Sequence, residues 1–275
     1  MTSLPTPLLR FERFHDIVID APAANILDYV SNPNSWPKWI AATHAIDSPD
    51  RPLQAGETFH ERWATRTGEA SLGWRVTARE QPWLWEAQTH TSFIGTIIVR
   101  YEIEPTTGGQ RFRRRLINPD RPKMPTEEMI RRTDEEAVIC LRNIKQQVER
   151  SLIHQQCLLT LDHFMAALNA HDSAAMDKQM HFPHVRLAKG TVVVYEQPGS
   201  NPMDLFDRLK ADDDWLYSEW VERTLVQCNA LKAHYALSYN RFRSKGSLIG
   251  QYESLYVLTK ADGRWGILAR SSLGP

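Results

Sequence analysis

The sequence predicts an α+β protein with two domains, and two observations carry this prediction. Residues 126–182 contain neither Gly nor Pro and repeat apolar residues at helical spacing, whereas the segments on both sides read as short strand-like runs divided by turn residues. The helical stretch also carries two apolar stripes that differ in direction by about half a turn. A chain of 275 residues is long enough for two domains of roughly 130 residues, each with its own core.

The two stripes mark the boundary between the domains. The first stripe ends at Leu152 and the second begins at Leu158. Either the helix breaks between Ser151 and Gln156, or one long helix offers opposite faces to two separate cores. Both interpretations place the boundary here, so we expect one domain at residues 1–153 and a second at residues 156–275.

Composition argues against several classes of protein. The 33 Lys and Arg residues balance the 33 Asp and Glu residues, so we expect no nucleic-acid partner and no attraction to an anionic membrane. Three distant cysteines without a CxxC motif indicate free thiols in a reducing compartment. The sequence shows no apolar signal segment and no run of 18 apolar residues, so we expect a cytoplasmic protein that does not span a membrane.

The first domain reads as one strand, two short helical segments, six strands and the long helix. We expect the first strand at 11–20, a helix opened by Ala21–Pro22 and a helical turn at 34–40. Turn residues then divide strand-like runs at about 43–48, 57–66, 69–80, 83–92, 95–104 and 110–118, which is typical of an antiparallel meander. Thr126 is a suitable N-cap for the long helix, which is large and apolar enough to cover the sheet.

This element order, together with the segment DIVIDAPAANILDYVSNPNSWPKW at Asp16–Trp39, resembles the START-like polyketide cyclase/dehydrase superfamily, also called SRPBCC or helix-grip. The resemblance covers roughly residues 8–153. It implies a curved antiparallel sheet that grips a helix, with a cavity between them. The superfamily contains lipid carriers, hormone receptors, cyclases and oxygenase subunits, so the resemblance does not determine the chemistry.

Strand alternation predicts which side chains face that cavity. Two charged residues, Glu61 and Arg114, share the apolar phase of their strands, and a buried charge is costly unless it is paired or used. They form either part of a ligand site, or an internal ion pair, or they lie outside if the register differs by one residue. The candidate ligand-binding residues of this domain are Glu61, Trp63, Trp74, Trp85, Tyr101 and Arg114.

The second domain reads as a helix, a short helix, a hairpin, another helix and a four-strand meander. This order, with the closing segment Tyr252–Leu273 and the segment HFPHVRL at His181–Leu187, resembles the NTF2-like or SnoaL-like superfamily over about residues 156–275. The resemblance implies a cone-shaped α+β fold that hosts isomerases, dehydratases, cyclases and non-catalytic domains. It also implies a possible homodimer through the outer face of the sheet.

No catalytic motif of those families aligns with this sequence, so the candidates in the second domain rest on position alone. Asp162 lies beside the apolar stripe of the helix and could act as a general base in the mouth of the cone, or it is a partly exposed helix residue. The other catalytic candidates are His181, His184 and Tyr239, and Tyr256 and Arg270 are candidate ligand-binding residues. Since no further ligand completes the pair His181 and His184 at a familiar spacing, we predict no metal site.

The sequence contains no P-loop, no GxGxxG after a strand, no GxSxG and no HExxH. We therefore expect no cofactor. The leading hypothesis is a cofactor-independent cyclase, dehydratase, isomerase or lyase that acts by acid/base chemistry on a hydrophobic, aromatic or polyketide-like small molecule. The alternative is a non-catalytic carrier of a hydrophobic ligand, with the second domain serving dimerisation.

Overall fold

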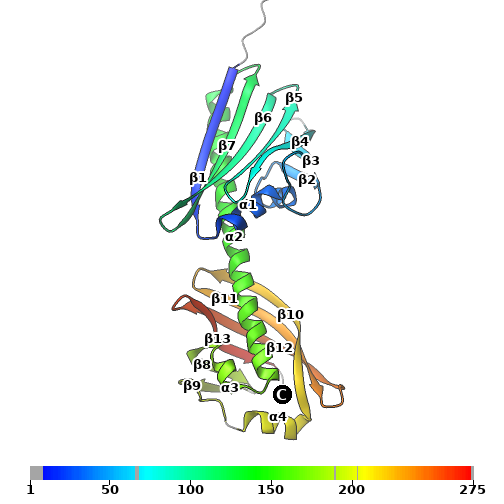
Figure 1. Cartoon of the computed structure of the whole chain (residues 1–275), viewed down its shortest axis with the longest axis vertical. Helices are drawn as coiled ribbons and strands as arrows, with labels where there is room; N and C mark the ends of the chain where they lie inside the picture. The colour runs from blue at the N-terminus through cyan, green and yellow to red at the C-terminus, as the bar shows by residue number, and fades with distance from the viewer. Residues whose placement is uncertain (1–8, 66–67, 189, 203, 274–275) are drawn as a thin grey trace, which may run out of the picture. The chain divides into compact units, whose positions relative to one another are not determined.

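The computed structural model describes residues 9–65, 68–188, 190–202 and 204–273. The chain divides into two compact units, Met1–Glu149 and Arg150–Pro275. Both are α+β, with one large, mainly antiparallel sheet each, which confirms the predicted fold class (Figure 1).

The N-terminal unit is built on a seven-stranded antiparallel sheet. Its strand order is β1-β7-β6-β5-β4-β3-β2, so the first strand closes one edge beside the last and the remaining strands form a meander. The strands are β1 (Leu9–Ile19), β2 (Thr43–Asp47), β3 (Thr58–Thr65), β4 (Gly68–Glu80), β5 (Leu84–Thr91), β6 (Gly95–Thr106) and β7 (Gly109–Arg121). Turn residues separate them where the sequence predicted.

Three helical segments complete this unit. The helix α1 (Ala23–Ser31) and the 3-10 helix η1 (Pro33–Lys38) connect β1 to β2, and the first part of α2 (Glu127–Asn169) runs along one face of the sheet (Figure 1). The α2 side chains Ala137, Leu141, Ile144 and Val148 are buried. These are members of the first apolar stripe, so its helical spacing is what allows α2 to cover the sheet.

The C-terminal unit has a six-stranded sheet with the order β10-β11-β12-β13-β8-β9. All neighbouring strands are antiparallel except β13 and β8, which pair in parallel. Because a parallel pair needs a crossover, strands far apart in the sequence become neighbours. The strands are β8 (Met180–Ala188), β9 (Thr191–Tyr195), β10 (Trp215–Asn229), β11 (Lys232–Arg243), β12 (Leu248–Ala261) and β13 (Arg264–Ser272).

The helices of this unit are the second part of α2 and two short segments, α3 (Ser173–Asp177) and α4 (Leu205–Asp213). The Asp172 side chain accepts a hydrogen bond from the Ala175 amide at 2.9 Å and caps α3. The core of the unit joins Cys157, Leu161 and Phe164 of α2 to inward residues of the strands. The second apolar stripe therefore serves a different core from the first.

The helix α2 is continuous from Glu127 to Asn169. Of the two alternatives that the sequence left open, the long helix is the one that forms. The segment Ser151–Gln156 contains no helix breaker, so the change of stripe needs no break in the backbone.

Candidate functional site

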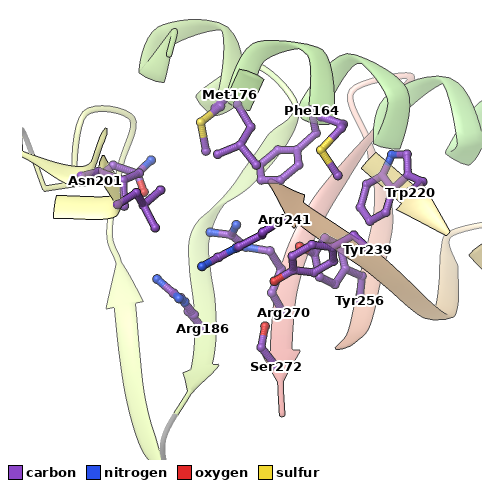
Figure 2. Close-up of a pocket in the computed structure, with 14 residues that line it drawn as sticks. Phe164, Met176, Arg186, Asn201, Trp220, Tyr239, Arg241, Tyr256, Arg270 and Ser272 are labelled. Atoms are coloured by element: carbon purple, nitrogen blue, oxygen red, sulfur yellow. The ribbon is translucent and has the colours of Figure 1, made fainter. Parts of the chain in front are cut away.

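A pocket in the C-terminal unit lies between α2 and the inner face of the sheet (Figure 2). Its free volume is about 70 Å³. Apolar side chains from the helices form much of its wall: Phe164, Met165, Leu168, Met176, Leu205 and Leu209. The strands supply Trp220, Tyr239, Tyr256 and three arginines, Arg186, Arg241 and Arg270. The pocket is thus apolar toward the helices and cationic toward the strands.

The register of three adjacent strands builds the cationic part. Tyr256 on β12 lies opposite Arg270 on β13, and Arg270 lies opposite Arg186 on β8. Directly paired residues point to the same face of a sheet. A tyrosine and two arginines therefore stand in one row on the pocket side, and Figure 2 shows these side chains beside one another.

Arg270 is held by its surroundings. Its Nε donates a hydrogen bond to Nε2 of His184 at 2.9 Å, and its guanidinium carbon lies 5.1 Å from the centre of the Phe164 ring. His184 is fully buried and lies 2.9 Å, through Nδ1, from the carbonyl oxygen of Ile267. Since Nε2 must accept from the arginine, we assign the proton of the neutral ring to Nδ1. Burial lowers the pKa of His184 to about 4, with Arg270 contributing to the shift.

Arg241 is held by aromatic rings instead. Its guanidinium carbon lies 4.7 Å from the centre of the Tyr252 ring and 5.8 Å from that of Tyr239, and the two rings stack on each other at 5.6 Å. Such cation–π contacts orient a guanidinium without neutralising it. The cation stays available to a ligand.

The pocket wall contains no Asp, Glu or His among the described residues. The carboxylate of Asp177 is buried in the same unit, but its oxygens accept from the Gly199 amide at 2.6 Å and from Asn201 Nδ2 at 2.8 Å. Asp177 thus holds the loop that carries Asn201, a lining residue, and does not face the arginines as an ion-pair partner.

Three of the four predicted catalytic residues lie elsewhere. Asp162 does not enter the pocket, because its half-exposed side chain forms an ion pair with Arg223 on β10. His181 is half-buried and lies 2.9 Å from Thr259 Oγ1, outside the pocket wall. His184 sits behind Arg270 and positions it. Of the two interpretations of Asp162, the structure favours the partly exposed helix residue, and neither histidine is among the residues that line the pocket.

The other candidates of this domain do meet in the pocket. Tyr239, Tyr256 and Arg270 all line it. The candidate set omitted Arg186, Arg241 and Trp220. Arg241 shares the strand phase of Tyr239, and Arg186 shares that of His184, so alternation could have indicated both.

The interior of the N-terminal unit is an aromatic cluster around Trp36. The ring centre of Trp36 lies 5.2 Å from that of Phe59, 5.5 Å from Trp74 and 6.2 Å from Trp85, and Trp85 stacks on Tyr101 at 5.4 Å. The candidates Trp74, Trp85 and Tyr101 are therefore buried together around Trp36, whereas Trp63 is only half-buried.

Glu61 and Arg114 share this interior without forming an ion pair. The carboxylate of Glu61 is 3 % exposed and accepts hydrogen bonds from Thr43 Oγ1 and, at 2.8 Å, from Trp74 Nε1. Burial raises the pKa of Glu61. The Tyr101 hydroxyl and Nε of Arg114 are both buried without a hydrogen-bond partner among the described residues. Polar groups therefore lie inside the helix-grip fold, as the alternation predicted.

The described part of the chain holds no group of three or more His, Cys, Asp or Glu side chains placed to bind a metal ion. None of its helices combines the length and the apolar character needed to cross a membrane.

Comparisons with known proteins agree with the architecture of the first unit. Residues 14–149 match the family model described as "Polyketide cyclase / dehydrase and lipid transport". The N-terminal unit resembles this family. The match supports a ligand-binding or cyclase-type role at that coarse level. No curated protein sequence matches the chain.

Several solved structures are similar to parts of the chain. The di-domain ARO/CYC StfQ from the steffimycin biosynthetic pathway is 12 % identical, with a TM-score of 0.44 over 52 % of each chain. Protein MLL2253 from Mesorhizobium loti is 14 % identical, with a TM-score of 0.40 over 51 % of this chain and 98 % of its own. An NTF-2 like protein of unknown function from Shewanella oneidensis MR-1 is 15 % identical, with a TM-score of 0.35 over 43 % of this chain and 97 % of its own.

Proposed function

We propose that this chain is a small-molecule binding protein whose C-terminal pocket holds a ligand with an aromatic or other apolar body. The observation that carries the proposal is the pocket wall itself. It combines apolar helix residues with aromatic strand residues around a preformed hollow, which is the usual composition of a ligand site. Tyr239 and Trp220 offer ring faces to such a body, with ring centres 6.0 Å apart at nearly a right angle.

Binding without turnover is better supported than acid/base catalysis. A general base must lie within hydrogen-bond reach of the proton it removes. Among the described residues of the pocket wall, the titratable side chains are tyrosines and arginines. Burial raises the pKa of Tyr256, so this hydroxyl stays protonated and is a poor base near neutral pH.

One observation favours a second candidate, a cyclase-type enzyme. The Tyr256 hydroxyl and the Arg270 guanidinium are neighbours on paired strands. Together they could donate to an oxygen on which negative charge develops, as an oxyanion site does. The description of the family matched by residues 14–149 includes both cyclases and lipid transport, so it is compatible with either candidate.

In this proposal the N-terminal unit also binds or encloses a hydrophobic molecule. Its buried aromatic cluster and the unpaired polar atoms of Tyr101 and Arg114 support this role. A polar atom buried without a partner is costly, and a polar group of a ligand would remove that cost.

The test is native mass spectrometry of the purified full-length chain, followed by release and identification of any retained molecule. Leu168→Trp would fill the pocket, and Leu159→Trp is the matched control because Leu159 is 58 % exposed on the same helix. We expect the wild type and Leu159→Trp to retain a ligand unchanged over long incubation, and Leu168→Trp to lose it. Conversion of the ligand would support the cyclase candidate, and equal retention by Leu168→Trp would place the ligand outside this pocket.

Dimerisation through the outer face of the C-terminal sheet stays a prediction. Leu216, Val221, Val226 and Leu255 are exposed apolar side chains of strands β10 and β12, and such side chains are candidates for an interface. Light scattering across a concentration series tests it, with Leu255→Glu as the variant expected to shift the mass toward the monomer.

A further inference from the structure

Within the part of the chain that the structure describes, the three arginines of the C-terminal pocket have no acidic partner. Within the described residues, no Asp or Glu oxygen lies within 4.0 Å of a guanidinium nitrogen of Arg186, Arg241 or Arg270. On the outer face of the N-terminal sheet the opposite holds. There Arg111, Arg113 and Arg115 each meet a carboxylate, at 3.0, 3.5 and 2.6 Å. Both sets of arginines are half-buried, yet within the described residues only the set on the N-terminal sheet is neutralised by carboxylates.

Two of these arginines also lie directly opposite each other in the sheet. Arg186 and Arg270 are directly paired on β8 and β13, and like charges directly opposite each other destabilise a sheet. The pocket also excludes part of the solvent that would screen them, which strengthens the repulsion. An anion seated between the two arginines would turn this repulsion into attraction.

The arginines are also restrained before any ligand binds. Nε of Arg270 donates a hydrogen bond to His184, and the Arg270 guanidinium packs on the Phe164 ring. The Arg241 guanidinium packs on the rings of Tyr252 and Tyr239. A restrained guanidinium loses little freedom when it binds, and its planar fork matches the two oxygens of a carboxylate. His184 thereby acts as a positioning residue and not as a proton donor.

This inference rests on the proposed function. We propose that the ligand of the C-terminal pocket is an organic acid, whose carboxylate is bound between Arg186 and Arg270 and whose apolar body lies against Phe164 and Trp220. Arg241 adds a third positive charge to the site. The free volume of about 70 Å³ is smaller than the roughly 150 Å³ of an apolar cavity that holds benzene, so the carboxylate and only part of the apolar body would lie inside the pocket.

The experiment compares acids with neutral molecules of the same shape on the full-length chain. Benzoate, phenylacetate and hexanoate are titrated by calorimetry beside benzamide, phenylacetamide and hexanamide, with inorganic phosphate as a separate arm. We expect each acid to bind at least tenfold more tightly than its amide. Arg186→Gln and Arg270→Gln should remove that preference, whereas Arg111→Gln, on the exposed face of β7, should keep it.

The outcomes separate this inference from the proposed function. Equal binding of acids and amides in the pocket overturns the organic-acid assignment and leaves the proposed function standing. Failure of every acid and amide to bind contradicts both. Tight binding of phosphate with weak binding of the acids overturns the carboxylate assignment. If Arg270→Gln does not fold, Arg241→Gln takes its place, with at least a threefold loss of benzoate affinity expected.

A structural readout tests the placement directly. The indole N–H of Trp220 is buried without an acceptor among the described residues, so its NMR signal reports on the pocket and is assigned through Trp220→Phe. We expect benzoate to shift this signal in the wild type and in Arg111→Gln. A shift that persists unchanged in the double variant Arg186→Gln and Arg270→Gln would overturn the proposal.

Discussion

Nε of Arg270 donates a hydrogen bond to Nε2 of His184, so a buried neutral histidine holds the arginine that faces the pocket. The bond joins two residues that are 86 positions apart in the sequence. It requires an unprotonated Nε2, because a protonated imidazole has no acceptor and would place a second positive charge against the arginine.

The first prediction concerns acid sensitivity. The pKa of His184 in the folded chain, about 4, lies below its ordinary value of 6.5. As the pH falls, the imidazole therefore takes up a proton in the unfolded state before it does so in the folded state. The free energy of unfolding consequently decreases as the pH falls from about 6.5 to about 4. The contribution of this one group is about 3 kcal/mol.

Hydrogen exchange of the β8 and β13 amides measures this loss in the C-terminal unit alone. His184→Gln keeps an acceptor for Arg270 and removes the titration, so we expect a flatter pH dependence of protection. The matched control is His163→Gln, which changes an exposed histidine on α2. An equal pH dependence in the wild type and His184→Gln would contradict the prediction.

The second prediction concerns the repulsion between paired arginines. Arg186→Gln should raise the free energy of unfolding of the ligand-free C-terminal unit by about 0.5 kcal/mol at low salt, because it removes a like charge opposite Arg270. The gain should shrink in high salt, where the repulsion is screened. Arg111→Gln removes a paired arginine and should give no gain. A loss of stability in Arg186→Gln would show that the arginine is compensated in some other way.

The third prediction concerns the buried carboxylate of the N-terminal unit. Thr43→Val removes one of the two hydrogen bonds to Glu61 without changing the shape of the side chain. A hydrogen bond to a charged group contributes about 1.5–3 kcal/mol, so we expect a loss of that size in urea unfolding near neutral pH. Thr77→Val, which removes an exposed hydrogen bond to Glu86, should cost less than half as much. Equal losses in the two variants would argue that Glu61 is already protonated.

The fourth prediction separates Asp162 from the pocket. Asp162→Asn breaks an ion pair with Arg223 in which Asp162 is half-exposed, and such pairs contribute at most about 1 kcal/mol. We expect a small loss of stability and ligand affinity within twofold of the wild type, measured by calorimetry with benzoate. A tenfold loss of affinity or of any turnover would restore Asp162 as a residue of the site.

The sequence was most informative where local rules decide the structure. Gly95 and Gly263 adopt positive φ, at 87° and 75°, at the turns between β5 and β6 and between β12 and β13. Apolar alternation likewise placed Trp74 and Trp85 inside the first unit. The predicted strands consequently agree with the observed ones along nearly the whole described chain.

Position within the site depended on contacts that no local pattern encodes. Asp162 stands at the border of an apolar stripe, and helical periodicity cannot decide whether such a residue turns inward or toward a cation on another strand. Arg223 on β10 decides it. The role of His184 depends on the parallel pairing of β8 with β13, which is non-local and left no signal in either strand.

The parallel pairing of β8 with β13 also affects when the C-terminal unit can complete its folding during synthesis. As the chain leaves the ribosome, β8 emerges long before its neighbour β13, which is the last strand of the C-terminal sheet. Such long-range pairings form slowly because a large loop must close first. A chain halted before β13 would carry Arg186 and Arg241 but could not join them to Arg270, so retention of a ligand would report that the unit has finished folding.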